Sequence, residues 1–117
     1  MKVATVVFAG TESHDDLARM VNAMMVVREF TEAGDDATLI FDGAATRWPG
    51  KLSDPDHVAH RLYESVRGAI AGACSYCADS FDATDDVREA GVTLLDEYKR
   101  HPSFRSLVVA GYEVLTF

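Results

Sequence analysis

The sequence predicts an α/β fold: a three-layer, flavodoxin-like domain with a mostly parallel sheet of five strands. Segments rich in apolar and β-branched residues alternate along the chain with segments of helical periodicity. This is typical of a parallel sheet with helices on both faces. The first strand segment, residues 2–9, shows no polar alternation, as expected of a strand covered on both faces. The length of 117 residues suits one domain, and no repeat, linker or low-complexity segment divides residues 1–117.

Two strands and a long helix are predicted in the first part of the chain. After the strand at residues 2–9, Ser13 is a favourable helix N-cap. The helix predicted over residues 13–33 ends before Gly34, a typical residue at a helix C-terminus. A second strand covers residues 36–41. These elements form the first β-α-β unit of the predicted sheet.

The apolar stripe of this long helix is wider than one face of a sheet requires. It includes Met20, Met24 and Met25, and we consider two interpretations: packing against another subunit, or a thickly covered core. Trp48, the only tryptophan, lies in a segment at residues 44–52 that is predicted as a loop or short helical turn. We consider three roles for it: a lid, an interface anchor, or a side chain that fixes its own loop to the domain.

The second part of the chain is predicted to alternate helices with three further strands. Asp54-Pro55-Asp56 is a typical helix start, and Val58, Leu62 and Val66 recur at helical spacing up to about Arg67. The elements that follow are a strand at residues 69–73, a helix to about residue 81, a helix at 85–90, a strand at 92–95, connecting chain at 96–100, a helix at 102–110 and a strand at 112–117.

Both cysteines lie in the motif Cys74-Ser75-Tyr76-Cys77, at the predicted junction of a strand and a helix. The free amides and dipole of a helix start favour a thiolate. We therefore expect Cys74 to be an exposed, nucleophilic sulfur and Cys77, one helical turn on, to be its partner. We assign Cys74 and Cys77 as catalytic residues, and Ser75, Tyr76 and the strand-end Asp42 as substrate-binding residues. Two simpler interpretations stay open: both cysteines as small buried apolar residues, and Asp42 as a turn former.

The chain resembles the DsrE-like family of small sulfur-handling proteins over nearly its whole length. The motifs that carry the resemblance are Glu32-Ala33-Gly34 after the long helix, Phe41-Asp42-Gly43 after the second strand, Cys74 at a strand-to-helix junction, and the closing segment 107–117. The resemblance implies a flavodoxin-like fold and a homo-oligomer, either trimer or hexamer. It also implies a cysteine that accepts a persulfide from a donor protein and passes it to an acceptor. Cys74 matches that cysteine, while Cys77 is a second cysteine that many sulfur-relay members lack and other members have.

Two alternative functions remain open beside sulfur transfer. His57 and His60, three positions apart, would give four zinc ligands together with Cys74 and Cys77, although we assign no metal. The second alternative is a non-catalytic assembly or small-molecule-binding protein in which the cysteines are incidental. No cofactor is expected, because residues 11–16 are too acidic to hold the phosphate of a flavin.

Charge and the lack of special segments restrict the remaining function classes. The net charge of −8, from 19 acidic and 11 basic residues, argues against nucleic acid as the main partner. No apolar stretch approaches a membrane span and no signal peptide precedes the first strand, so we expect a cytoplasmic protein with no membrane partner. The aspartate-rich composition suits either a high-salt cytoplasm or a GC-rich genome. His14 and His101 lie near predicted helix starts, and we expect both at the surface without a role.

Overall fold

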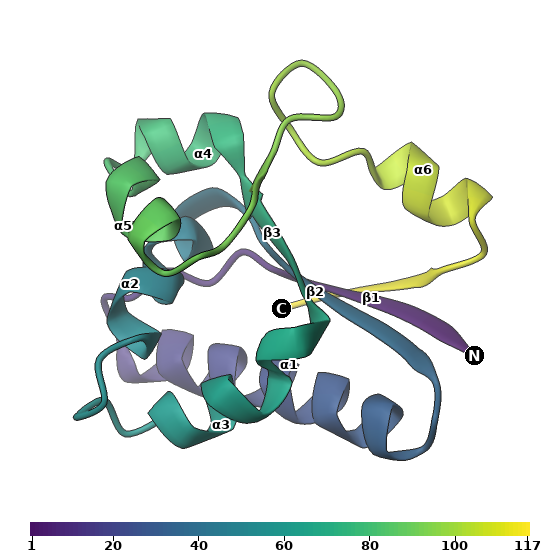
Figure 1. Cartoon of the computed structure of the whole chain (residues 1–117), viewed down its shortest axis with the longest axis horizontal. Coiled ribbons are helices and arrows are strands. Elements are labelled where there is room, and N and C mark those ends of the chain that lie inside the picture. The colour runs from purple at the N-terminus through teal and green to yellow at the C-terminus, as the bar shows by residue number, and fades with distance from the viewer.

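Five parallel strands form the central sheet in the computed structural model, which describes residues 1–117 (Figure 1). In spatial order the strands are β4 (Leu94–Leu95), β3 (Ile70–Cys74), β2 (Asp36–Phe41), β1 (Lys2–Val7) and β5 (Glu113–Thr116). All four neighbouring pairs run in the same direction, so the predicted mostly parallel sheet is entirely parallel. On one side of β1 the sheet continues through β2 and β3 to β4, and on the other side β1 pairs with β5.

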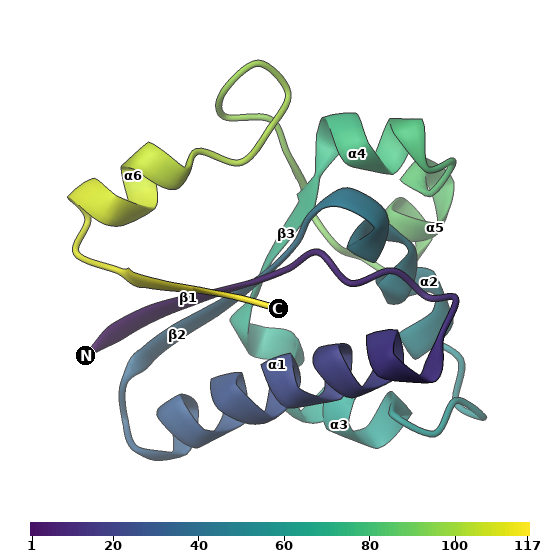
Figure 2. The same ribbon diagram turned by 180° about the vertical axis from the view of Figure 1, so that it is seen from behind.

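Helices flank the sheet on both faces, which confirms the predicted three-layer, flavodoxin-like α/β architecture (Figures 1 and 2). α1 and α3 lie together on one face, α6 lies on the other, and α2, α4 and α5 gather near the carboxyl ends of the strands. The helices are α1 (His14–Glu32), α2 (Trp48–Leu52), α3 (His60–Val66), α4 (Ser75–Ser80), α5 (Thr84–Glu89) and α6 (Phe104–Val109), with 3-10 turns η1 (Gly43–Arg47) and η2 (Arg67–Ala69). None of them has the length and apolar character needed to cross a membrane.

The core forms between the sheet and α1. The long helix begins and ends where the sequence predicts, because the Ser13 hydroxyl accepts a hydrogen bond from the Asp16 amide at 3.1 Å and Gly34 adopts a left-handed φ of 83° after the last turn. Met20 and Met24 are completely buried. Met20 and Met24 therefore belong to the core, as the second interpretation expects, whereas Met25 is 49% exposed and its packing against another subunit stays a prediction.

α3 begins five residues later than the sequence predicts, with its N-cap at Ala59 rather than at Asp54 and its first helical residue at His60. The side chains of this segment bond locally: Asp54 Oδ1 accepts from the Asp56 amide at 2.9 Å, and His57 Nδ1 accepts from the Ala59 amide at 3.0 Å. Such side-chain bonds stabilise consecutive turns in competition with a helix. Val58, predicted on the packed face, is consequently 82% exposed.

Trp48 fixes its own loop to the body of the domain. Its side chain is buried, and its Nε1 donates a hydrogen bond to the Ala9 carbonyl at 2.9 Å. The lid and interface interpretations of Trp48 are therefore wrong. By fixing the chain that follows β2, Trp48 also stabilises the turn η1, which packs against α4 beside the cysteines.

Candidate functional site

The two cysteines and a histidine meet at the carboxyl edge of the sheet. Asp42 directly follows β2, Cys74 is the last residue of β3, and the segment after β4 brings His101 to the same place. The carboxyl ends of parallel strands share one edge of a sheet, which is where α/β proteins bind ligands. Ligand atoms of Cys74, Cys77 and His101 all lie within 4.8 Å of one another.

Gly72 allows β4 to approach β3 closely just before the site. A Cβ atom at this position would lie 2.4 Å from the Thr93 carbonyl oxygen and 2.7 Å from Leu95 Cγ, closer than real contacts permit. Glycine is therefore required at position 72 for the pairing of Ala73 with Leu94 and of Cys74 with Leu95. This pairing sets where the chain leaves β4, and hence where His101 lies.

The Cys74 sulfur is enclosed but has polar neighbours. The Cys77 amide donates to Sγ at 3.4 Å, His101 Nδ1 lies 3.3 Å from it, and the Arg100 carbonyl oxygen lies at 3.8 Å. The side chain is completely buried, and this burial raises the pKa of Cys74 to about 12. The expected amide contact is confirmed, whereas the expectation of an exposed thiolate is wrong because packing removes water from the sulfur.

Cys77 is the cysteine closer to solvent. It is partly exposed, and its thiol donates to Asp42 Oδ1 at 3.3 Å. The same carboxylate oxygen accepts from the Gly43 amide at 2.8 Å, which fixes the orientation of Asp42. Burial, followed by smaller effects of Asp42, raises the pKa of Cys77 above its ordinary value. Asp42 is therefore in direct contact with the cysteine motif, as its position at a strand end predicts.

From the sequence we expect no role for His101, but the structure places its ring beside the two cysteines. Tyr98 and His101 exchange backbone hydrogen bonds of 2.9 and 2.8 Å around Lys99 and Arg100, whose φ angles are 47° and 69°. Two consecutive positive φ values define a tight hairpin turn of type I′. The Arg100 carbonyl then accepts from the Tyr76 amide at 2.9 Å, which attaches the turn to α4. In the sequence, the only indication that His101 lies near the cysteines is that it follows the strand predicted after the cysteine strand.

Tyr76 packs against the His101 ring, whereas Ser75 does not contact the sulfurs. The Tyr76 ring is 48% exposed and lies 4.9 Å from the His101 ring at a tilt of 34°. The Arg100 guanidinium lies 5.5 Å from the Tyr76 ring centre. The Ser75 hydroxyl makes no hydrogen bond to either cysteine. Tyr76 therefore lies beside the cluster and Ser75 does not bond to it, and the substrate-binding roles of both residues stay predictions.

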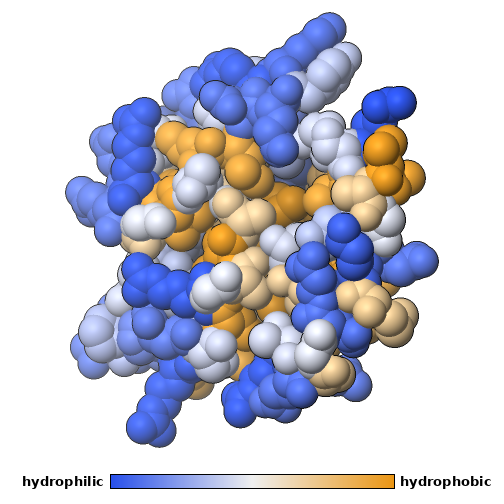
Figure 3. Space-filling view, turned by 45° about the vertical axis from the view of Figure 1, so that its right-hand side comes forward, coloured by the Kyte–Doolittle hydropathy of each residue, from blue (hydrophilic) through white to orange (hydrophobic).

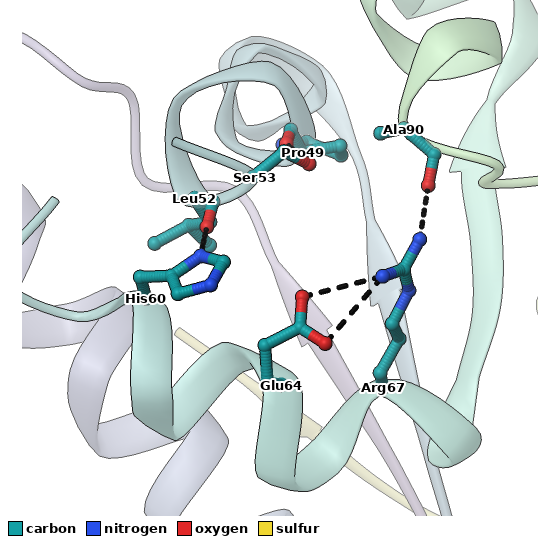
Figure 4. A network of polar contacts seen from close by, with 7 residues as sticks. All are labelled: Pro49, Leu52, Ser53, His60, Glu64, Arg67 and Ala90. Carbon is teal, nitrogen blue, oxygen red and sulfur yellow. Dashed lines mark hydrogen bonds and ion pairs between the residues drawn. The ribbon is translucent and has the colours of Figure 1, made fainter. Parts of the chain in front are cut away.

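The alternative zinc ligands His57 and His60 lie outside this cluster. His60 Nδ1 contacts the Leu52 carbonyl at 2.7 Å, so its ring connects α3 with the end of α2 (Figure 4). Two turns further along, Arg67 donates hydrogen bonds to the Glu64 carboxylate and to the Ala90 carbonyl, the latter at 2.9 Å (Figure 4). These contacts hold neighbouring helices together. The four-ligand set predicted from His57, His60 and the cysteines is therefore wrong.

The fold and site define a small parallel α/β protein with a Cys-x-x-Cys and histidine cluster at the carboxyl edge of its sheet. The chain is similar to an uncharacterised protein of Methanocaldococcus jannaschii, with 23% identity over 116 residues that cover 98% of this chain and 94% of the relative. No family model matches the sequence. No solved structure matches this protein.

Proposed function

We propose that the protein is a persulfide carrier that accepts sulfane sulfur at the Cys74–Cys77 pair and passes it to an acceptor thiol. The observation that carries this proposal is the 3.3 Å contact between Cys74 Sγ and His101 Nδ1. A ring nitrogen at this distance can take the thiol proton, which is the usual way in which a protein activates a cysteine. The resemblance to DsrE-like proteins agrees with this chemistry.

Unequal exposure of the two sulfurs suggests the order of transfer. Cys77 is partly exposed and therefore meets the donor first. Its proton passes to Asp42, and its thiolate attacks the outer sulfur of the donor persulfide. The donor S–S bond breaks, the donor leaves as a thiolate, and Cys77 carries the persulfide. No net oxidation occurs, because one sulfur–sulfur bond replaces another.

Cys74 then takes the sulfur into the enclosed part of the site. His101 accepts the proton of Cys74, and the Cys74 thiolate attacks the outer sulfur on Cys77, which leaves as a thiolate. The two sulfur atoms lie within 4.8 Å of each other, and they must move closer together for this transfer. A persulfide on Cys74 is shielded from water and from small oxidants, which favours storage. Return to Cys77 precedes attack by the acceptor thiol.

The assembly is part of the same proposal. Figure 3 shows apolar side chains gathered across one face of the molecule. On α6, Val108 and Val109 are 64% and 69% exposed, and β5 is an edge strand whose outer side has no partner. Such surfaces are typical of interfaces. They support a homo-oligomer, for which the family resemblance implies a trimer or hexamer, in a cytoplasmic protein that exchanges sulfur with partner proteins.

Intact mass measured after incubation with polysulfide tests the proposal. We expect the reduced protein to gain one sulfur atom that dithiothreitol removes, and the Cys74→Ser/Cys77→Ser double variant to gain none. His14→Ala is the matched histidine control, because His14 is exposed and lies outside the cluster. If the wild-type protein gains no sulfur, the persulfide proposal fails, and the alternative of a non-catalytic binding or assembly protein is favoured. The burial of Cys74 is the observation that favours this alternative.

A further inference from the structure

The same three side chains have the composition of a metal site. Two thiols and an imidazole come from three positions, with Cys74 at the end of β3, Cys77 in the first turn of α4 and His101 after β4. Cysteine sulfur and histidine nitrogen are the ligands that zinc prefers in proteins. We propose that Cys74, Cys77 and His101 bind a thiophilic divalent cation such as Zn²⁺, with the fourth coordination position open. This goes beyond persulfide carriage and does not depend on it.

The distances agree with such a site. Ligand atoms bound tetrahedrally to zinc lie about 3.5 Å apart for a sulfur–nitrogen pair and about 3.8 Å apart for a sulfur–sulfur pair, given the usual bond lengths. Cys74 Sγ and His101 Nδ1 are already 3.3 Å apart. The greatest separation within the cluster is 4.8 Å, so binding requires only a small contraction.

The backbone holds all three ligands before a metal arrives. The Cys77 amide bonds to Cys74 Sγ, so the α4 turn fixes both cysteines. The hairpin that carries His101 is attached to α4 by the 2.9 Å bond from the Tyr76 amide to the Arg100 carbonyl. A preorganised ligand set loses little conformational freedom on binding, which favours affinity.

Asp42 is the outer partner of this site rather than its fourth ligand. Its Oδ1 lies 3.3 Å from Cys77 Sγ, but Asp42 does not belong to the group of ligand atoms within 4.8 Å. Three protein ligands leave the fourth position to water or a ligand thiol, as in reactive zinc sites. The opening lies on the partly exposed side formed by Cys77 and His101.

The binding step balances in protons and charge. Each thiol releases its proton to solvent, the two thiolates and the neutral Nδ1 donate electron pairs to the cation, and no electron is transferred. Two protons leave for each Zn²⁺ bound, so affinity increases with pH. A bound cation also occupies both sulfurs, and it therefore excludes a persulfide from the same site.

Titration of the reduced full-length protein with Co²⁺, followed by displacement with Zn²⁺, tests the inference. We expect one equivalent of Co²⁺ to produce visible absorption typical of tetrahedral thiolate ligation, and Zn²⁺ to abolish it. Cys74→Ser and Cys77→Ser should each weaken the thiolate bands, the double variant should abolish them, and His101→Ala should weaken binding about tenfold or more. His14→Ala should bind as the wild type does. Circular dichroism of each variant establishes that it is folded.

Two results would overturn the inference: no stoichiometric Co²⁺ or Zn²⁺ binding by the folded wild type, or unchanged binding by the Cys74→Ser/Cys77→Ser double variant. Neither depends on sulfur transfer. Polysulfide uptake by metal-free protein, measured in parallel by mass, distinguishes failure of the metal site from failure of the persulfide proposal. If both functions use the cluster, one equivalent of Zn²⁺ prevents the gain of sulfur.

Discussion

His101 Nδ1 lies 3.3 Å from Cys74 Sγ, although the two residues are 27 positions apart. The contact depends on the pairing of β3 with β4 and on the hairpin at residues 98–101. It brings a proton acceptor to a buried thiol. The proposed chemistry of the site therefore depends on long-range packing as well as on the Cys-x-x-Cys motif.

Replacing His101 should slow sulfur transfer to Cys74. His101→Ala removes the nitrogen that takes the proton of Cys74, and loss of a general base typically costs on the order of a hundredfold in rate. The rate is measured in a single turnover with polysulfide by quenched-flow mass spectrometry. His14→Ala controls for loss of a histidine elsewhere. A His101→Ala protein that is folded and transfers sulfur at the wild-type rate would remove His101 from the mechanism.

The two cysteines should differ in reactivity toward iodoacetamide. Cys77 is partly exposed, whereas Cys74 is completely buried, so we expect Cys77 to be alkylated at least about tenfold faster in the native protein. Peptide mapping by mass spectrometry measures both rates, and the difference should disappear in urea. Faster alkylation of Cys74 in the native protein would contradict the burial that defines the order of transfer.

The raised pKa of Cys74 predicts how stability depends on pH. The pKa rises from 9.0 to about 12 on burial, so above about pH 9 the unfolded chain loses a proton that the folded chain keeps. The free energy of unfolding should therefore decrease as pH rises from about 9 toward 12, since the folded state then binds more protons. Urea unfolding across this range measures the slope. Cys74→Ser should show a shallower decrease, and equal slopes would contradict the prediction.

Substitution of Gly72 should damage both the sheet edge and the site. Gly72→Ala places a Cβ 2.4 Å from the Thr93 carbonyl, and overpacking of this kind costs about 1–3 kcal/mol or more. Gly68→Ala is the matched control, because a Cβ there meets no atom within 4 Å. Thermal and urea unfolding measure the difference. Gly72→Ala should also expose Cys74 to alkylation, as β4 and the segment that follows it move away. Equal stability of the two variants would show that β4 does not pack as described.

Much of the fold follows from local sequence patterns. The continuous apolar run of β1 and the capped helix α1 specify their own structure, and both form where expected. The start of α3 could not be predicted, because local side-chain bonds of Asp54 and His57 stabilise turns where the Asp-Pro pattern indicates a helix. Local preference is a weak guide where two structures compete for the same backbone groups.

The site was predictable only in part. Asp42 and Cys74 end neighbouring strands, so parallel pairing alone brings them together. His101 follows a strand of two residues, Leu94–Leu95, and ends a hairpin that is held by long-range contacts with Cys74 and Tyr76. No periodicity marks such a segment. The burial of Cys74 was also missed, because helix-start patterns do not show what packs over the sulfur.

Time-resolved peptide mapping of the reduced protein after addition of polysulfide tests the central claim most directly. The account predicts that the sulfane sulfur is found first on Cys77 and then on Cys74, and that His101→Ala retains it on Cys77. A native protein in which neither cysteine acquires sulfur, while the urea-unfolded chain does, would contradict the account.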